Sequence, residues 1–207
     1  MTIDEGAIDR QAVTMAVNGL LAGDHSSTDA FFFSRGCTPP QIQIDPPADN
    51  IDGEQIIFLH EYWNQISTPS EIPRTDAIDP LDMVPVLGYI ALVDVLEDGW
   101  RFRYRLFGSS LVQIFGHDMT GRYVSELPGP VDVAYFFTAV YRAALILKRP
   151  IVTAHVPAPD VGAQSWRRVV LPLADDAGAV TRFLVGNTPI GWRAAERGFA
   201  DYPGSLA

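Results

Sequence analysis

The sequence predicts an α+β fold in which one antiparallel sheet is flanked by helices. Helical periodicity occupies two stretches within residues 8–66, and strand periodicity replaces it at residues 89–106 around an Asp-Gly turn. After a longer helical stretch, three short strand-like runs follow residue 150. Short connections between consecutive strands favour antiparallel pairing, because parallel strands need a long crossover between them.

The first fifty residues are expected to form a helical extension and a linker. A short amphipathic helix is predicted over residues 8–21, with one apolar face made of Val13, Val17, Leu20 and Leu21. Prolines 39, 40, 46 and 47 indicate an extended linker over residues 38–50. The Phe31-Phe32-Phe33 triplet interrupts this polar region, and we expect it to dock on the domain or on a partner.

A second helix is predicted to begin near Asp52 and to end before Pro69. Asp52 and Gln55 have the spacing of a capping box, and an apolar face follows with Ile56, Leu59, Trp63 and Ile66. Phe58 and Tyr62 form another apolar pair one turn apart. Because apolar residues occupy more than one side, we expect Leu59 and Trp63 to contribute to an interface with a second copy of the chain.

The clearest strand signal follows the turn at residues 97–99. Arg101, Arg103 and Arg105 alternate with Phe102, Tyr104 and Leu106, so one strand face is predicted to be cationic and the other apolar. Two interpretations of the arginine row stay open. It binds an acidic partner or an anionic ligand, or it faces solvent and pairs with a cross-strand acid such as Asp94.

The remaining elements alternate between short helices and strands. Prolines at 73, 80 and 85 exclude one straight helix over residues 72–87, and Asp79-Pro80 is expected to begin a short one. Helices are predicted over residues 109–115 and 133–148, a short turn over 120–127, and strands over 151–156, 166–171 and 182–186. In the run 166–171, either Trp166 and Val170 or Val169 and Leu171 point inward.

Four motifs resemble the PAS_5 family of bacterial PAS domains. They are Ile72-Pro73-Arg74, Ile78-Asp79-Pro80-Leu81-Asp82, Phe102-Arg103-Tyr104-Arg105-Leu106-Phe107-Gly108 and Gly116-His117-Asp118-Met119-Thr120-Gly121-Arg122. The resemblance covers residues 56–189. It implies a five-stranded antiparallel sheet that encloses a small cavity with its helices, and a stand-alone sensory or protein-interaction module in signalling. We expect an N-terminal extension and linker at 1–50, the PAS-like domain at 51–190 and a C-terminal tail at 191–207.

Six side chains are candidates for lining that cavity: Phe102, Tyr104, Phe136, Val140, Tyr141 and His155. A ligand pocket and a filled aromatic core are alternative interpretations of these rings. Tyr104 is the strongest candidate, because a buried phenol needs a polar partner. His155 is predicted to share a strand face with Thr153.

The resemblance also bears on cofactors. Haem-binding PAS domains carry a histidine on the longer helix, and residues 133–148 contain none. Light-sensing flavin PAS domains carry a cysteine near the short helices, whereas Cys37 lies far from them in sequence. We therefore expect neither haem nor covalent flavin photochemistry. Reversible flavin binding stays open, and the ligand is unknown.

Charge and composition narrow the class of partner. The formal net charge of −10 disfavours binding to nucleic acids and to anionic membranes. No apolar run approaches the roughly 20 residues that span a bilayer, and the N-terminus lacks the order of a signal peptide. One cysteine and four scattered histidines do not indicate a metal site. We expect a cytoplasmic protein that works through a protein partner and forms a homodimer.

No catalytic residue is predicted. Gly108-Ser109-Ser110 is not a nucleophile elbow, and the chain has no glycine-rich phosphate loop. An alternative is an isomerase or dehydratase with a cone-shaped α+β fold, in which a carboxylate meets a histidine or tyrosine inside the cavity. A purely structural dimerisation module is a further alternative.

Overall fold

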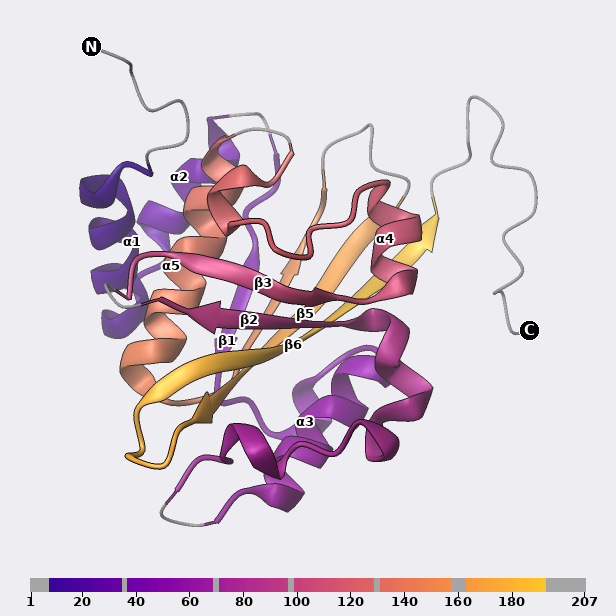
Figure 1. Cartoon of the computed structure of the whole chain (residues 1–207). Coiled ribbons are helices and arrows are strands. Elements are labelled where there is room, and N and C mark those ends of the chain that lie inside the picture. Colours follow the sequence, from indigo (N-terminus) through magenta and orange to yellow (C-terminus); the bar gives the residue numbers. More distant parts are fainter. Residues whose placement is uncertain are drawn as a thin grey trace.

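The computed structural model describes residues 8–34, 37–68, 71–96, 99–128, 131–157 and 163–192. Helices cover both faces of one antiparallel sheet, which confirms the α+β prediction (Figure 1). The strands lie in the order β1 (Gln41–Ile44), β4 (Ile151–His155), β5 (Ala163–Ala174), β6 (Val180–Trp192), β2 (Ile90–Val95) and β3 (Phe102–Phe107). The predicted count of five strands is therefore corrected to six.

The additional strand, β1, comes from the segment that was predicted to be a linker. It pairs with β4 at one edge of the sheet, and its Ile42 is buried in the core. Pro39 and Pro40 precede the strand, and Pro46 and Pro47 follow it. Proline has no N–H for strand pairing, so these residues limit β1 to four residues.

One face of the sheet is covered by α5 (Val131–Leu147), on which α1 (Arg10–Ala22) and α2 (Ser26–Phe33) pack (Figure 1). Asp9 caps α1 by accepting hydrogen bonds from the backbone N–H groups of Gln11 and Ala12. Val13 and Leu20 are buried as predicted, whereas Leu21 is 39% exposed.

The phenylalanine triplet docks on α5 through two of its three rings. The ring centroid of Phe32 lies 5.0 Å from that of Phe136, and the centroid of Phe31 lies 5.9 Å from that of Tyr135. Phe33 is exposed. The predicted docking on the domain is thus confirmed for Phe31 and Phe32.

The opposite face of the sheet is covered by α3 (Glu54–Ile66) and the 3-10 segments η1 (Ala48–Asn50), η2 (Thr75–Ala77) and η3 (Pro80–Tyr89). The predicted cap of α3 is wrong, because Gly53 rather than Asp52 occupies the N-cap position and makes no side-chain bond. Asp79 caps η3 as predicted, with its Oδ1 accepting from Leu81 N at 2.9 Å.

A glycine lets α3 approach the sheet closely. A Cβ atom at Gly186 of β6 would lie 2.5 Å from Leu59 Cδ1 and 3.1 Å from Val169 Cγ1, both shorter than ordinary van der Waals contact. Gly186 therefore leaves the space that the side chain of Leu59 fills, and the helix packs directly on β5 and β6.

A bulge in the β2–β3 hairpin breaks the alternation that the sequence predicts. Leu92 pairs with Leu106 and Val93 pairs with Tyr104, so Arg105 is an extra residue on β3. Tyr104 lies in the core under α5, whereas Leu106 is on the other side and partly exposed. Phe107 then lies beside Tyr104, with ring centroids 5.4 Å apart.

Short elements connect the hairpin to α5. Helix α4 (Ser109–Phe115) ends at Gly116, whose φ of 76° is left-handed, in agreement with the predicted boundaries. The 3-10 turn η4 (Val124–Glu126) follows. Among the described residues, no helix is long and apolar enough to cross a membrane.

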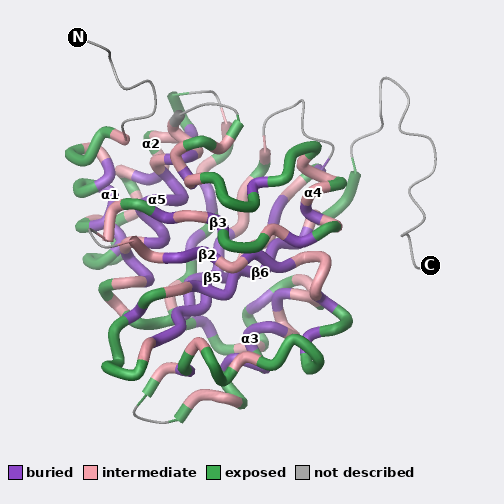
Figure 2. Tube along the Cα trace, viewed as in Figure 1, coloured by how far each residue is buried: buried purple, intermediate pink, exposed green. Residues whose placement is uncertain are grey.

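Burial on both sides of the sheet explains why the inward face of residues 166–171 could not be decided. Trp166 and Val170 belong to the core cluster under α5, and Val169 and Leu171 belong to the cluster under α3. Figure 2 shows the resulting buried trace along the central strands. Both alternatives therefore point into a core.

Candidate functional site

A polar row crosses three neighbouring strands on the face that α5 covers. Thr153 of β4 stands opposite Arg168 of β5, and Arg168 stands opposite Asn187 of β6. Arg168 donates from Nε to Asn187 Oδ1 at 2.6 Å. Its guanidinium carbon lies 3.6 Å from the ring centroid of Phe137, on α5. The row therefore lies between the sheet and the helix, and an arginine is stacked on an aromatic ring there.

His155 shares this face of β4, two residues beyond Thr153. Its ring centroid lies 5.8 Å from that of Phe137 and 6.1 Å from that of Phe136. Burial, together with the nearby charges of Arg168 and Arg167, lowers the pKa of His155 to about 3. The imidazole is therefore neutral near pH 7, with one ring nitrogen able to donate and the other able to accept.

Two buried tyrosines adjoin the polar row. Tyr141 of α5 stacks on Phe183 with ring centroids 5.5 Å apart and lies 5.3 Å from Phe102. Burial raises the pKa of Tyr141 and of Tyr104, so both phenols keep their protons. The two hydroxyls also interact with each other, so each is a neutral group beside a second phenol inside the aromatic core.

Several buried polar atoms in this region have no hydrogen-bond partner within the described part of the chain. They are Thr138 Oγ1, Tyr141 OH, Thr153 Oγ1, His155 Nδ1 and Arg168 Nη1. Such an atom ordinarily costs about 1–3 kcal/mol when it stays unsatisfied, so most buried polar groups are paired. We call these five residues the inner polar cluster. Thr153, His155 and Arg168 lie on the sheet face under α5, and Thr138 and Tyr141 lie on α5 itself, so the candidate site is where this helix covers the sheet.

The structure brings the predicted pocket residues together in one region. Phe102, Tyr104, Phe136, Val140 and Tyr141 belong to the core cluster under α5, and the ring of His155 packs against Phe136. Their role in ligand binding stays a prediction. Sequence reasoning missed Arg168, Thr138 and Asn187. The available signal was the alternation Trp166-Arg168-Val170, in which a cation occupies an apolar face.

Leu59 and Trp63 do not offer a surface to a partner, which corrects the prediction made for them. Both are buried in the cluster between α3 and the sheet. Trp63 also donates from Nε1 to Pro172 O at 2.8 Å. The several apolar sides of this helix are explained by contacts with the sheet and with the segment 72–92 of the same chain.

The predicted arginine row is largely engaged within the chain. Arg103 and Arg182 contact the carboxylate of Asp94 at 3.1 and 2.8 Å, and Arg105 lies 3.9 Å from it. Burial alone would raise the pKa of Asp94, but the hydrogen bonds from the first two arginines outweigh it and lower the pKa. Arg101 stacks 4.4 Å from the ring centroid of Tyr123. The cross-strand alternative thus describes Arg103 well, whereas Arg105 is 57% exposed.

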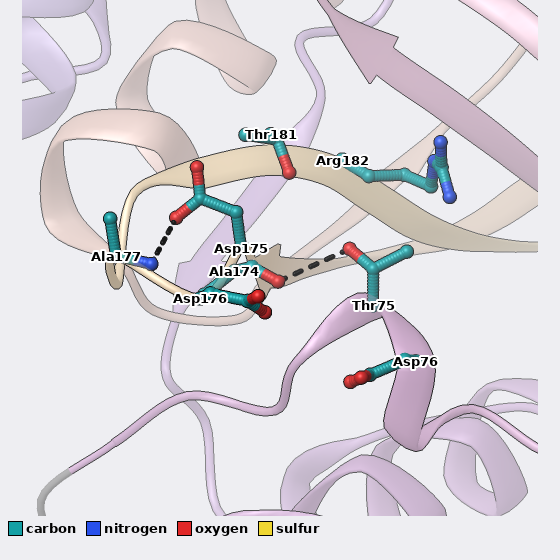
Figure 3. A pocket seen from close by; sticks show the side chains of 8 residues that line it. All are labelled: Thr75, Asp76, Ala174, Asp175, Asp176, Ala177, Thr181 and Arg182. Carbon is teal, nitrogen blue, oxygen red and sulfur yellow. Dashed lines mark hydrogen bonds between the residues drawn. The ribbon is translucent and has the colours of Figure 1, made fainter.

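An open surface hollow of about 530 Å³ lies at the turn between β5 and β6 (Figure 3). Its polar groups serve the local structure: Asp175 accepts from Ala177 N, and Thr75 donates to Ala174 O. Asp76 pairs with Arg74 at 2.8 Å. The lining residues are Thr75, Asp76, Ala174, Asp175, Asp176, Ala177, Thr181 and Arg182. Within the described chain, no group of three or more His, Cys, Asp or Glu residues could hold a metal ion.

The acid–base pair that an isomerase or dehydratase would need is not formed by the described residues. Asp94 is the buried carboxylate of the sheet, and it lies on the face opposite to the inner polar cluster. None of the contacts of Arg168 or His155 among the described residues involves a carboxylate.

Comparison with known proteins identifies the family. A family model described as a PAS domain, PAS_5, matches residues 53–186. Among solved structures, the chain is similar to one titled as the structure of an RNA-binding Light-Oxygen-Voltage receptor, with 15% sequence identity and a TM-score of 0.40. That alignment covers 86% of this chain and 48% of the other, so the chain spans about half the length of that protein. No curated protein matches the chain.

Proposed function

The chain belongs to the PAS_5 family of PAS domains, and on this premise we propose that it is a sensory and protein-interaction module in bacterial signalling. A small ligand between α5 and the sheet regulates its association with a protein partner. The module works in the cytoplasm and forms a homodimer.

The inner polar cluster is the observation that carries this proposal. A domain that served only as a structural unit would gain stability from an apolar core of the same shape. Here, buried polar atoms of β4 and β5, on the face that α5 covers, and of α5 itself have no hydrogen-bond partner of ordinary geometry among the described residues. A bound molecule with matching polar groups would form hydrogen bonds with these atoms. Its binding would change the conformational equilibrium of the neighbouring helices and strands.

The strand β5 offers a route from the ligand to the rest of the molecule. Arg168 faces the ligand, and the next residue towards the chain start, Arg167, faces the opposite side, where its guanidinium lies 3.7 Å from the Asp52 carboxylate. Asp52 lies two residues before the start of α3. A shift of β5 on ligand binding would therefore change the contact at the start of this helix.

For the partner surface we propose the arginine side of the edge strand β3. This strand ends the sheet, and Arg105 is exposed there next to Leu106. A cationic edge is complementary to an acidic partner, which is how charged surfaces select partners and raise association rates.

Native mass spectrometry of the protein purified from its own source, compared with the same sample after denaturation, tests the proposal. We expect a small mass that denaturation releases, together with the mass of a partner or a second copy. Arg105→Glu should lose the partner and retain the small mass. Arg149→Glu, at the other edge of the sheet, should retain both. A bare monomer in every sample would contradict the proposal.

A further inference from the structure

The chemistry of the inner polar cluster defines the ligand more narrowly. Arg168 can only donate hydrogen bonds, and the hydroxyls of Thr138, Tyr141 and Thr153 can each donate one. His155 supplies a further ring nitrogen that can donate in one tautomer. The cluster is therefore rich in donors, and the group that satisfies it must be rich in acceptors.

Arg168 also carries the positive charge of the inner polar cluster. Other arginines of the central strands have carboxylate partners: Arg167 pairs with Asp52, and Arg182 with Asp94. Arg168 makes its polar contact to the neutral amide of Asn187 and packs on Phe137, and it makes no ion pair among the described residues. A half-buried guanidinium without a carboxylate is costly, because a charge in a low-dielectric region needs compensation.

We propose that the inner polar cluster binds the carboxylate of a small monoanionic ligand, with Arg168 as its ion-pair partner. This inference rests on the proposed function, because it specifies the ligand of that same site. Arg168 Nη1 and the Thr153 hydroxyl lie on adjacent strands at opposed positions, and Thr138 and Tyr141 belong to α5, the helix that covers this face of the sheet. A carboxylate has two oxygens and about four acceptor positions, which suits this number of donors.

The number of charges distinguishes a carboxylate from a phosphate. One guanidinium faces the region, and the other groups of the cluster are neutral, since His155 and Tyr141 are held uncharged by burial. A single negative charge is therefore balanced, whereas a phosphate dianion would bring a second charge into a buried site.

The surroundings of the cluster define the rest of the ligand. The rings of Phe136, Phe137 and Tyr141 flank the polar groups, and Phe102 and Phe183 pack on Tyr141. An apolar body attached to the carboxylate would find aromatic neighbours here and bury its surface against them.

Titration of the full chain with acids and their amides tests this inference. Acetate, benzoate and octanoate are compared with acetamide, benzamide and octanamide by isothermal titration calorimetry. We expect at least one acid to bind about tenfold or more tightly than its amide, the size expected for an ion-pair contact. Equal affinity of acid and amide for all three pairs, or no binding of any acid, overturns the inference.

Two variants of β5 locate the contact. Arg168→Gln should weaken binding of the preferred acid by about tenfold or more, because the amide keeps hydrogen bonds and loses the charge. Arg167→Gln removes the neighbouring charge, which lies on the opposite face but still acts on His155, so it should weaken binding by no more than about twofold. If both variants bind with the unchanged affinity, the carboxylate is not bound by Arg168 and the inference fails.

Thr153→Val provides a second route should Arg168→Gln fold poorly. It removes one proposed donor and leaves the charge, so we expect a smaller loss, about threefold to tenfold. An unchanged affinity would exclude Thr153 from the site and overturn the arrangement.

These outcomes separate the ligand class from the proposed function. If native mass spectrometry finds a neutral molecule released from the protein while no acid binds, the sensory function stands and the carboxylate inference fails. If an acid binds through Arg168 and no ligand-dependent association with any partner is found, the site stands and the signalling function fails.

Discussion

The two faces of the sheet differ in how their buried polar atoms are hydrogen-bonded. On the face under α3, polar atoms are paired: Trp63 Nε1 donates to Pro172 O at 2.8 Å, and Tyr62 OH accepts from Asp79 N at 2.9 Å. The imidazole of His60 contacts the amide of Asn64 at 3.2 Å. On the face under α5, Arg168 Nε bonds to Asn187 Oδ1, but one polar atom in each residue of the inner polar cluster has no hydrogen-bond partner of ordinary geometry among the described residues.

This difference indicates a division of roles within one domain. The face under α3 has a mainly aliphatic core with a few aromatic residues, and its polar contacts are satisfied, which is an arrangement that stabilises a fold. The face under α5 carries buried polar groups whose cost a bound ligand would offset, as we propose. In that proposal, stability and recognition lie on opposite sides of the same strands.

The largest effect is expected on the α3 face. Leu59 is fully buried and fills the space that Gly186 leaves. Leu59→Ala should lower the free energy of unfolding by about 2–5 kcal/mol, through lost burial and the cavity that remains. Leu81→Ala, at a residue 78% exposed, is the matched control and should change it by less than about 0.5 kcal/mol. Urea denaturation measures both, and similar values for the two variants would contradict the packing of α3 described here.

A pair of ring substitutions compares hydrogen bonding on the two faces. Trp63→Phe removes a donor and leaves the Pro172 carbonyl unpaired in the core, so a loss of about 1–3 kcal/mol is expected. Tyr141→Phe removes a hydroxyl that makes no hydrogen bond of ordinary geometry and interacts with the Tyr104 hydroxyl, so a smaller loss of about 0–1 kcal/mol is expected. The same denaturation series tests the pair. Equal losses would mean that the Tyr141 hydroxyl is satisfied in solution.

The pH dependence of stability distinguishes the histidines on the two faces of the sheet, His155 and His60. The pKa of His155 is about 3, whereas an unfolded histidine has a pKa near 6.5. As the pH falls below about 6.5, the unfolded chain takes up a proton that the folded chain does not. Stability therefore falls by about 1.4 kcal/mol per pH unit towards pH 3.

His60 gives the comparison on the other face. Burial also lowers its pKa, but the nearby charges of Asp45 and Glu61 oppose the shift. Between pH 7 and 4.5, His155→Gln should remove more of the acid-side slope than His60→Gln does. Thermal or urea denaturation across that range measures the slopes. A larger effect from His60→Gln would reverse the assignment.

The sequence predicted the elements of both faces better than it predicted their roles. The alternation around Tyr104 and the cap at Asp79 are local signals, and both were correct. The bulge at Arg105 could not be read from alternation, because one extra residue changes the face of everything after it. Strand β1 was hidden for a similar reason, since its pairing with β4 joins segments that lie more than a hundred residues apart.

The candidate site was predictable only in part. The aromatic residues Phe102, Tyr104 and Tyr141 were identified because rings at inward positions are visible as a pattern. Arg168 was missed because β5 is buried on both sides, so its sequence has no polar face to contrast with an apolar one. The role of a charged residue in such a strand can be inferred only when the element that covers it is known.

Replacing one threonine on each face has the smallest expected effect on stability. It tests the difference between the two faces most sharply, because the expected change has opposite signs on them. Thr153→Val replaces a 1% exposed hydroxyl that has no partner in the described residues, and we expect the free energy of unfolding to stay equal or rise by up to about 1 kcal/mol. Thr188→Val, on β6, removes a donor whose Oγ1 lies 3.2 Å from Gln55 Oε1, and about 0.5–1.5 kcal/mol should be lost. Precise urea denaturation of both variants resolves the signs. A loss at Thr153 as large as that at Thr188 would show that the Thr153 hydroxyl already has a hydrogen-bond partner in solution, such as an ordered water. The polar residues on the face under α5 would then stabilise the fold, as those on the other face do.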